Sequence, residues 1–186
     1  MSMLRLHDGM TLYHGSSVEV SSPDLLKCSP RKDFGRGFYL TSSLDQARAF
    51  ARIVARRVAR EAGDGQPACG IVSAYEVSRS DTLSIRSYET ADAEWLHCIV
   101  AHRQGHPFER LASELTRYDV ISGKVANDQT NATILAYLAG VYGEVGSQGA
   151  DEICVSLLLP ERLQDQACFR TGKAIACLGF QGSEGA

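Results

Sequence analysis

This chain of 186 residues lacks three features that would narrow its function at once: a long apolar run, a paired-cysteine motif and an excess of positive charge. Without an apolar run or a charged-then-apolar N-terminus, we expect no membrane-spanning helix and no signal peptide, and therefore a cytoplasmic location. The six cysteines are dispersed without a C-x-x-C pair, so we expect apolar core residues and no metal site. The net charge of −3 gives no general basic field for holding nucleic acid.

The length, with 44% hydrophobic residues, predicts a single domain spanning residues 1–186. Its clearest helix runs from Ser43 to about Glu61 and begins with the capping-box pattern Ser43-x-x-Gln46. Apolar residues recur on one side of this helix: Ala47, Phe50, Ala51, Val54 and Val58. On the other side lie Arg48, Arg52, Arg56 and Arg60, which favour a solvated outer face over a nucleic-acid contact on so acidic a chain.

The rest of the chain mixes helical and strand patterns, which indicates the α+β class. An apolar, β-branched run after a loop rich in Gly and Pro predicts a central strand. The expected elements are strands at 70–77, 118–121 and 166–170, and helices at 90–102, 131–138, 150–158 and 173–178, the last capped by Thr171.

Two short motifs each join a polar side chain at a strand end to glycine. The first is Leu12-Tyr13-His14-Gly15-Ser16, and the second is Phe34-Gly-Arg-Gly-Phe-Tyr-Leu-Thr-Ser42, which presents Tyr39. Glycine has no side chain and lets the backbone approach a ligand closely, although either motif alone is typical of an ordinary turn. Two such strand ends in one chain predict one shared pocket.

Together these motifs resemble the ADP-ribosyltransferase superfamily, in the branch that includes diphtheria toxin and the poly(ADP-ribose) polymerases. In that branch a His-Gly pair ends the first strand and a Gly-x-Gly-aromatic-Tyr run opens the second, as His14-Gly15 and Gly35-x-Gly37-Phe38-Tyr39 do here. The chain is similar, more closely, to a small bacterial toxin-like family of that fold in the blocks Asp33–Thr41, Tyr118–Asp128 and Asp165–Thr171. The resemblance covers nearly the whole chain and implies two small packed β-sheets flanked by helices.

The resemblance also implies NAD as the substrate and assigns roles to the motif residues. The Gly15 backbone would hold the nicotinamide carboxamide, His14 would hydrogen-bond a ribose hydroxyl, and Tyr39 would stack on the nicotinamide ring. Phe50 corresponds to a second ring on the opposite face of the nicotinamide, with plain core packing as its alternative. Further NAD contacts are expected from Tyr13, Ser16, Arg31, Gly37 and Phe38, with Arg31 meeting the pyrophosphate.

The third catalytic position falls at Gln166, where the wider superfamily usually carries Glu. An amide orients a ribose hydroxyl but cannot act as a carboxylate base or oppose the positive charge of an oxocarbenium ion. The close bacterial relatives also carry Gln, so we interpret this position as part of an intact site. Glu161 and Asp165 are the nearby carboxylates, and we expect both to be surface residues in a polar loop.

Three further polar residues are candidates for positioning an acceptor or ordering a loop: Asp33, Asn127 and Asp128. For Asp33, as for Arg31, the alternative is a solvated loop charge. For Asn127 and Asp128 the alternative is a turn or a helix N-cap after the preceding strand.

Three functions follow from the resemblance. The first is a toxin-like NAD-dependent mono-ADP-ribosyltransferase that modifies an intracellular macromolecule, a protein in preference to nucleic acid, and that has a small neutralising partner protein. The second is another enzyme of the same fold, either an NAD glycohydrolase or an RNA 2′-phosphotransferase, although the chain lacks an evident basic face. The third is a catalytically weak NAD-binding interaction module, which Gln166 keeps open.

Overall fold

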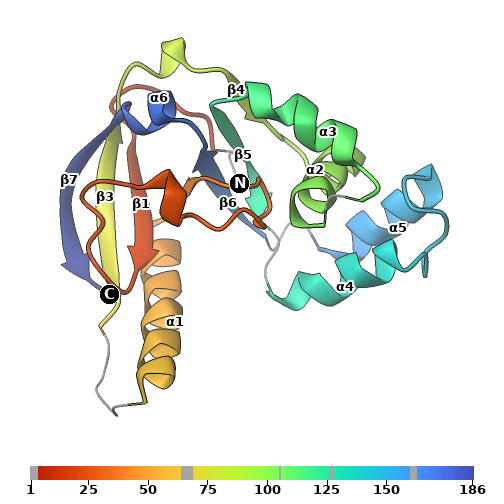
Figure 1. Cartoon of the computed structure of the whole chain (residues 1–186), viewed down its shortest axis with the longest axis horizontal. Helices are drawn as coiled ribbons and strands as arrows, with labels where there is room; N and C mark the ends of the chain where they lie inside the picture. Colours follow the sequence, from red (N-terminus) through yellow and green to blue (C-terminus); the bar gives the residue numbers. More distant parts are fainter. Residues whose placement is uncertain (1–3, 64–68, 105, 126–127, 160–162) are drawn as a thin grey trace.

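The computed structural model describes residues 4–63, 69–104, 106–125, 128–159 and 163–186, apart from the side chains of Asp128 and Gln129. Its strands form two sheets, which confirms the α+β class (Figure 1). The three-stranded sheet has the order β1 (Thr11–Ser16), β3 (Ile71–Val77) and β7 (Leu178–Gly185). The four-stranded sheet has the order β2 (Phe38–Leu40), β6 (Gln164–Phe169), β5 (Val120–Val125) and β4 (Ile85–Ser87). All strand pairs are antiparallel except β4 with β5.

Helix α1 (Leu44–Ala62) is the predicted helix with the capping signal, and it lies against β1 and β3. The Ser43 side chain accepts a hydrogen bond from the Gln46 amide at its start, and Gly63 ends it with a left-handed φ of 66°. The helix backbone comes very close to the strands, because a Cβ on Gly15 would lie only 2.2 Å from the Ala47 carbonyl oxygen. Only small residues fit such a contact, so the buried stripe consists of Ala47, Ala51 and Ala55.

This close contact corrects the predicted apolar face of α1. Phe50 is 46% exposed and Val58 is 39% exposed, so neither belongs to the core. The hydrophobic pattern placed the centre of the face among the large side chains, whereas the strands accept only the alanines. For Phe50, the alternative of plain core packing is therefore wrong.

The second sheet has one face against the first sheet and the other against helices (Figure 1). Between the sheets lie Phe38, Tyr75 and Phe169, with the Phe38 and Tyr75 rings edge to face at 5.5 Å. On the other face, Ile121 and Cys168 pack against the helices. Successive residues of a strand point to opposite faces, so a stretch covered on both sides is apolar throughout, as are Val120 and Ile121 at the start of β5 and Ala167–Phe169 at the end of β6.

Four helices make up the helical side: α2 (Ala93–Arg103), α3 (Glu109–Glu114), α4 (Asp128–Leu138) and α5 (Gln148–Leu157). The predicted core of α2 is confirmed, since Trp95, Leu96, Ile99 and Val100 are fully buried. Burying each such side chain contributes roughly 1.5–3 kcal/mol. The Trp95 indole N–H is also satisfied, donating to the Lys124 carbonyl at 2.8 Å.

The C-terminal strand β7 was not predicted from the sequence. The expected helix at 173–178 is shorter, α6 (Gly172–Ile175), and is capped as predicted by Thr171. The chain then turns at once into β7, whose residues pair with all of β3 around one irregularity at Ala74/Tyr75. Short 3-10 helices complete the described elements at Leu25–Lys27, Ser80–Thr82 and Leu115–Arg117. None of the described helices is both long and apolar enough to span a membrane.

Candidate functional site

In the described part of the chain, one backbone bridge connects the edges of the two sheets, and it lies between β1 and the end of β2. The Tyr13 amide donates to the Thr41 carbonyl at 2.8 Å, and the Thr41 amide donates to the Tyr13 carbonyl at 3.0 Å. Backbone groups of an antiparallel strand point to alternate sides, so Gly15, two residues on, directs its N–H and C=O to this same edge. Among the described residues the pairing with the end of β2 stops at this bridge, so the Gly15 N–H and C=O have no strand partner on this edge, and Gly15 itself is buried beside Ala47 and Ala51 of α1.

His14 spans the gap that opens beyond this bridge. Its Nδ1 lies 2.9 Å from the Tyr39 carbonyl oxygen, which accepts only, so Nδ1 carries the proton and Nε2 is left as an acceptor. The ring packs on Phe38 at 4.3 Å. Burial lowers the pKa of His14 below its ordinary value of 6.5, against the opposing effect of the hydrogen bond to Tyr39. The imidazole is therefore neutral at pH 7 and suited to accept a hydrogen bond from a hydroxyl.

The Tyr39 hydroxyl is fully engaged by the preceding loop. It donates to the Gly35 carbonyl and accepts from the Phe34 amide, both at 2.9 Å. Burial raises the pKa of Tyr39 well above its ordinary value, so the group stays protonated and keeps this donor role. Only the ring of Tyr39 remains for contact with a ligand, and its side chain is partly exposed.

The two glycines of this loop allow close contacts within the protein. Gly35 has a φ of 77°, and a Cβ there would lie 2.5 Å from the His102 ring. A Cβ on Gly37 would lie 2.4 Å from the Cys168 sulfur. The loop therefore packs directly against α2 and β6. This packing requires the two glycines, in addition to the expected approach of the loop backbone to a ligand.

Asp33 connects the same loop to helix α2. It is 5% exposed, and its carboxylate lies 2.6 Å from an Arg103 guanidinium nitrogen on α2. The alternative of a solvated loop charge is therefore wrong for Asp33, whose ion pair joins this loop to α2, and its loop-ordering role stays a prediction. Arg31 is exposed, and no carboxylate among the described residues forms an ion pair with it.

Phe38 and Tyr13 are expected NAD contacts that the structure places in packed surroundings. The Phe38 ring is 5% exposed and lies in the core between the sheets, so its side chain is a core group and not a ligand contact. Tyr13 is partly exposed and packs beside Ala47 and Ala51 of α1. Ser16, at the end of β1, is partly exposed.

Gln166 lies on β6, the strand that pairs with β2. Tyr39 is opposite Cys168 in this pairing, so Tyr39 and Gln166 share one face of the sheet as diagonal neighbours. Such neighbours are about 7–8 Å apart between backbones, within reach of one ligand. The three expected catalytic residues, His14, Tyr39 and Gln166, therefore come from three strands that follow one another across the join between the sheets.

The carboxylates near Gln166 are placed differently from the prediction. Asp165 is not in a loop but in β6, opposite Lys124 at 3.4 Å, with only 13% of its side chain exposed. Because neighbouring strand residues point to opposite faces, Asp165 does not share the face of Gln166. Glu161 and Asn127 lie outside the described residues, and Asp128 begins α4 without a described side chain.

Phe50 lies on the flank of α1 that faces the open edge of β1. On the other flank, Arg48 forms an ion pair at 2.7 Å with Glu184 of β7, the strand farthest from β1 in its sheet. Helix residues advance by about 100° each, which puts Arg48 and Phe50 on opposite sides of the alanine stripe. The exposed Phe50 ring therefore lies on the side of α1 where a ligand bound at Gly15 would contact it.

Sequence reasoning missed the residues that support the loop from behind. His102 donates through Nδ1 to the Cys98 carbonyl at 2.9 Å, and its Nε2 lies 3.4 Å from an Arg170 guanidinium nitrogen. Burial, and then the nearby Arg170 charge, lower the pKa of His102. The only available signal was a pair of polar residues at the end of an apolar helix, which is too common to identify a support.

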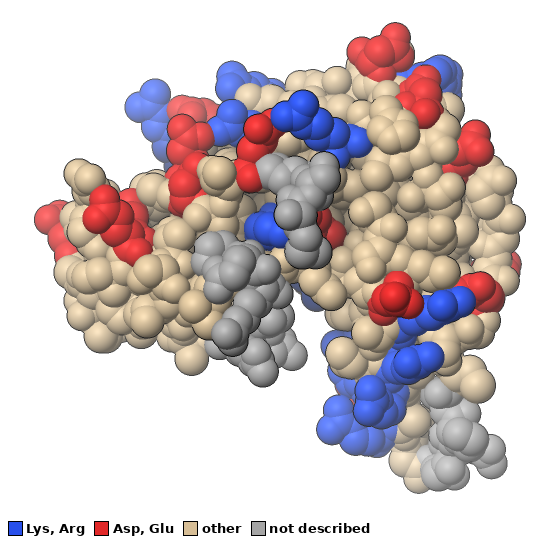
Figure 2. Space-filling model, turned by 180° about the vertical axis from the view of Figure 1, so that it is seen from behind, with Lys and Arg blue, Asp and Glu red and all other residues tan. Residues whose placement is uncertain are grey.

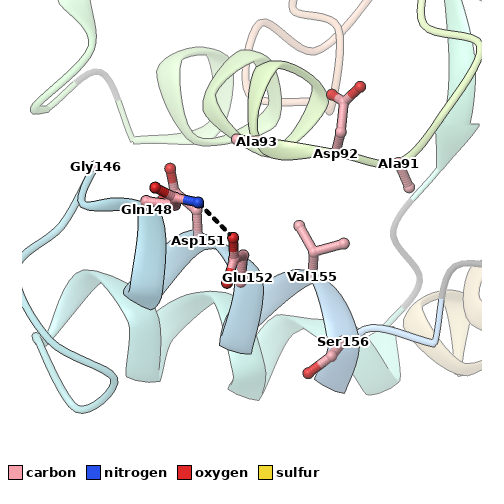
Figure 3. A pocket seen from close by; sticks show the side chains of 9 residues that line it. All are labelled: Ala91, Asp92, Ala93, Gly146, Gln148, Asp151, Glu152, Val155 and Ser156. Atoms are coloured by element: carbon pink, nitrogen blue, oxygen red, sulfur yellow. Dashed lines mark hydrogen bonds between the residues drawn. The ribbon is translucent and has the colours of Figure 1, made fainter.

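A separate pocket of about 630 Å³ lies between the start of α2 and α5 (Figure 3). Its polar lining is acidic, with Asp92, Asp151 and Glu152, and the Asp151 carboxylate is already bound by His97 at 2.9 Å and by the Tyr137 hydroxyl. A pocket lined by carboxylates without Lys or Arg repels pyrophosphate, so it is not a dinucleotide site. Across the described chain, no group of three or more His, Cys, Asp or Glu side chains is arranged to hold a metal ion.

Comparison with known proteins places the chain in a family. Residues 10–180 match the family described as "Protein of unknown function (DUF3990)", and the chain belongs to that family. No curated protein and no solved structure matches the chain.

Proposed function

We propose that the protein is an NAD-dependent mono-ADP-ribosyltransferase that transfers ADP-ribose to an intracellular protein and releases nicotinamide. The observation that carries the proposal is the edge of β1 beyond the Tyr13–Thr41 bridge, where the Gly15 N–H and C=O have no strand partner among the described residues and lie beside a neutral His14. A carboxamide can direct its C=O acceptor and one of its two N–H donors to the same side, which matches a backbone N–H and C=O on one strand edge.

The neighbouring side chains fit the rest of the nicotinamide riboside. The Tyr39 ring offers a stacking surface, and the exposed Phe50 ring offers a second on the α1 side. His14 Nε2 accepts from a ribose hydroxyl, and the partly exposed Gln166 amide orients the other hydroxyl. Arg31, exposed at the loop, is the expected partner of the pyrophosphate.

The chemistry asks for rigid positioning more than for a strong base. The C1′–N bond breaks, nicotinamide leaves with the bonding electron pair, and the acceptor nucleophile forms a bond to C1′ and gives up its proton. The hydrogen bonds that hold the Tyr39 loop and His14 fix the nicotinamide ribose against rotation. Gln166 cannot accept the proton that the acceptor nucleophile releases. A basic group of the acceptor protein or solvent water must therefore accept it.

Incubation with labelled NAD and a cell lysate tests the proposal. We expect free nicotinamide together with label on protein, and both should be lost in His14→Ala. Free ADP-ribose without labelled protein would indicate an NAD glycohydrolase, and binding without nicotinamide release would indicate an NAD-binding module. The latter is the second candidate, because none of the strand residues paired beside Gln166 and Tyr39 on their face of the sheet carries a carboxylate.

A further inference from the structure

The far half of α1 projects past the end of the three-stranded sheet and carries a concentration of positive charge. Figure 1 shows the helix continuing below the strands, and Figure 2 shows Lys and Arg side chains gathered on that projection. We call this surface the α1 arm, formed by the exposed residues Arg52, Ile53, Arg56, Arg57, Val58 and Arg60.

No described residue neutralises the arginines of the arm. Arg48, nearer the sheet, pairs with Glu184, but no described carboxylate forms an ion pair with any of the four arm arginines. Arg56 only donates through Nε to the Arg52 carbonyl of its own helix. Within the arm's length of the helix, Glu61 is the only carboxylate. A basic arm on a chain with a net charge of −3 is a local feature with its own attraction for acidic groups.

The arm also exposes two large apolar side chains. Ile53 is 54% exposed and Val58 is 39% exposed. Single exposed apolar residues are ordinary, but at about 100° per residue Ile53 lies on the same side of the helix as the four arginines, whereas Val58 continues the line of the alanine stripe. Arginine and apolar side chains together are typical of the centre of protein interfaces, where both are desolvated by the partner.

We propose that the α1 arm docks an acidic protein surface that presents apolar side chains between its carboxylates. Guanidinium groups form two parallel hydrogen bonds with carboxylates, which gives the contact its direction. Nucleic acid would use the arginines through its phosphates but would leave Ile53 and Val58 without partners. A bilayer needs one continuous apolar face, and Arg57 and Glu61 interrupt the apolar residues of this helix.

A defined probe makes the proposal testable without NAD. The probe is a fluorescently labelled helical peptide of about 20 residues that carries Glu on one face of the helix and Leu on the adjoining face. Its binding is measured by fluorescence anisotropy at about 0.05 M and about 0.5 M salt. We expect binding at low salt that weakens at high salt. The triple variant Arg52→Glu/Arg56→Glu/Arg60→Glu should weaken binding by about tenfold or more at low salt.

The control has the same charge change at other exposed cations. Arg5→Glu/Lys27→Glu/Arg110→Glu should weaken binding by less than about threefold, because these residues lie outside the arm. The milder Arg52→Gln/Arg56→Gln/Arg60→Gln variant should lose affinity in the same direction, which excludes misfolding as the cause. Ile53→Ser should weaken binding of the Glu–Leu peptide while leaving binding of polyglutamate unchanged.

Four results would overturn the proposal. Equal losses in the arm variant and the control would mean that net charge alone drives binding. Tighter binding of duplex DNA or single-stranded RNA, lost in the arm variant, would make the arm a nucleic-acid surface. Arm-dependent binding to phosphatidylserine vesicles without peptide binding would make it a membrane contact. Arm-dependent self-association in sedimentation would make its occupant a second copy, whose residues 128–159 contain acidic but no basic side chains.

Discussion

His14 and Tyr39 are linked across the join between the two sheets, with His14 Nδ1 donating to the backbone oxygen of Tyr39 at 2.9 Å. This hydrogen bond takes the place of the strand pairing that ends at Tyr13 and Thr41. It sets the tautomer of the imidazole, and so it decides which nitrogen a ligand meets. The two nitrogens of His14 therefore have separable roles, one in the fold and one in the proposed function.

One amide substitution separates these roles. In His14→Asn the side-chain N–H is placed near the position of Nδ1, so the hydrogen bond to Tyr39 and the stability should be kept while the Nε2 acceptor is lost. Nicotinamide release should then fall by roughly 10- to 1000-fold with a thermal midpoint within a few degrees of wild type. Wild-type turnover in a folded His14→Asn protein would show that Nε2 is not used.

In Tyr39 the hydroxyl stabilises the fold, whereas the ring has the proposed role in NAD binding. Tyr39→Phe keeps the ring but leaves the Phe34 amide and the Gly35 carbonyl without their partner, so we expect a loss of about 1–3 kcal/mol in unfolding free energy. NAD affinity measured by calorimetry should be nearly kept. Tyr39→Ala should also lose roughly 1–3 kcal/mol of NAD binding through the missing stack. Unchanged affinity in folded Tyr39→Ala would contradict the stacking role.

Gly15 tests the close contact between β1 and α1. The added methyl group of Gly15→Ala would meet the Ala47 carbonyl oxygen, a backbone atom within a helix that cannot rotate away. We expect a loss of about 1–3 kcal/mol or more in chemical unfolding, the usual cost of overpacking. Gly179→Ala is the matched control, because its nearest neighbour would be 3.6 Å away at the end of a side chain. Equal stabilities of the two variants would disprove the close contact.

The lowered pKa values of His14 and His102 predict weaker folding in mild acid. Below the ordinary value of 6.5 the unfolded chain binds a proton at each residue before the folded chain does, so stability falls as the pH drops through this window. The slope reaches at most about 1.4 kcal/mol per pH unit for each histidine. Urea unfolding between pH 5 and pH 7.5 measures it, at roughly constant ionic strength.

His102 and His7 provide the comparison for this pH effect. His102→Asn keeps a donor for the Cys98 carbonyl and removes one titrating group, so its stability should depend less steeply on pH than that of wild type. His7 is exposed, and His7→Asn should leave the slope unchanged. A slope that is the same in all three proteins would mean that His102 is protonated equally in the folded and unfolded states.

Local signals predicted the elements that are stabilised locally. The start of α1 followed from the capping pattern at Ser43, and its end at about Glu61 from the loop rich in Gly and Pro that follows in the sequence. Strand β7 has three glycines among its eight residues, and its stability comes from pairing with β3 more than a hundred positions earlier. The same holds for the site: His14, Tyr39 and Gln166 stood out as motif residues, whereas the Asp33–Arg103 pair joins residues 70 positions apart and has no local signal.

Gln166 is the residue on which the difference between catalysis and binding depends. If it orients a ribose hydroxyl, Gln166→Ala should lower nicotinamide release by roughly 10- to 1000-fold, the effect of removing one preorganised hydrogen bond, with NAD affinity nearly kept. Gln166→Glu should retain or raise NAD cleavage, because its carboxylate accepts the same hydrogen bond and adds negative charge beside the oxocarbenium ion. Gln164→Ala, also on β6 but exposed, is the matched control and should keep wild-type turnover. Wild-type rates in Gln166→Ala would mean that another group fills the third position. Because Asp165 points to the other face of β6, Glu161 would then be the carboxylate to substitute.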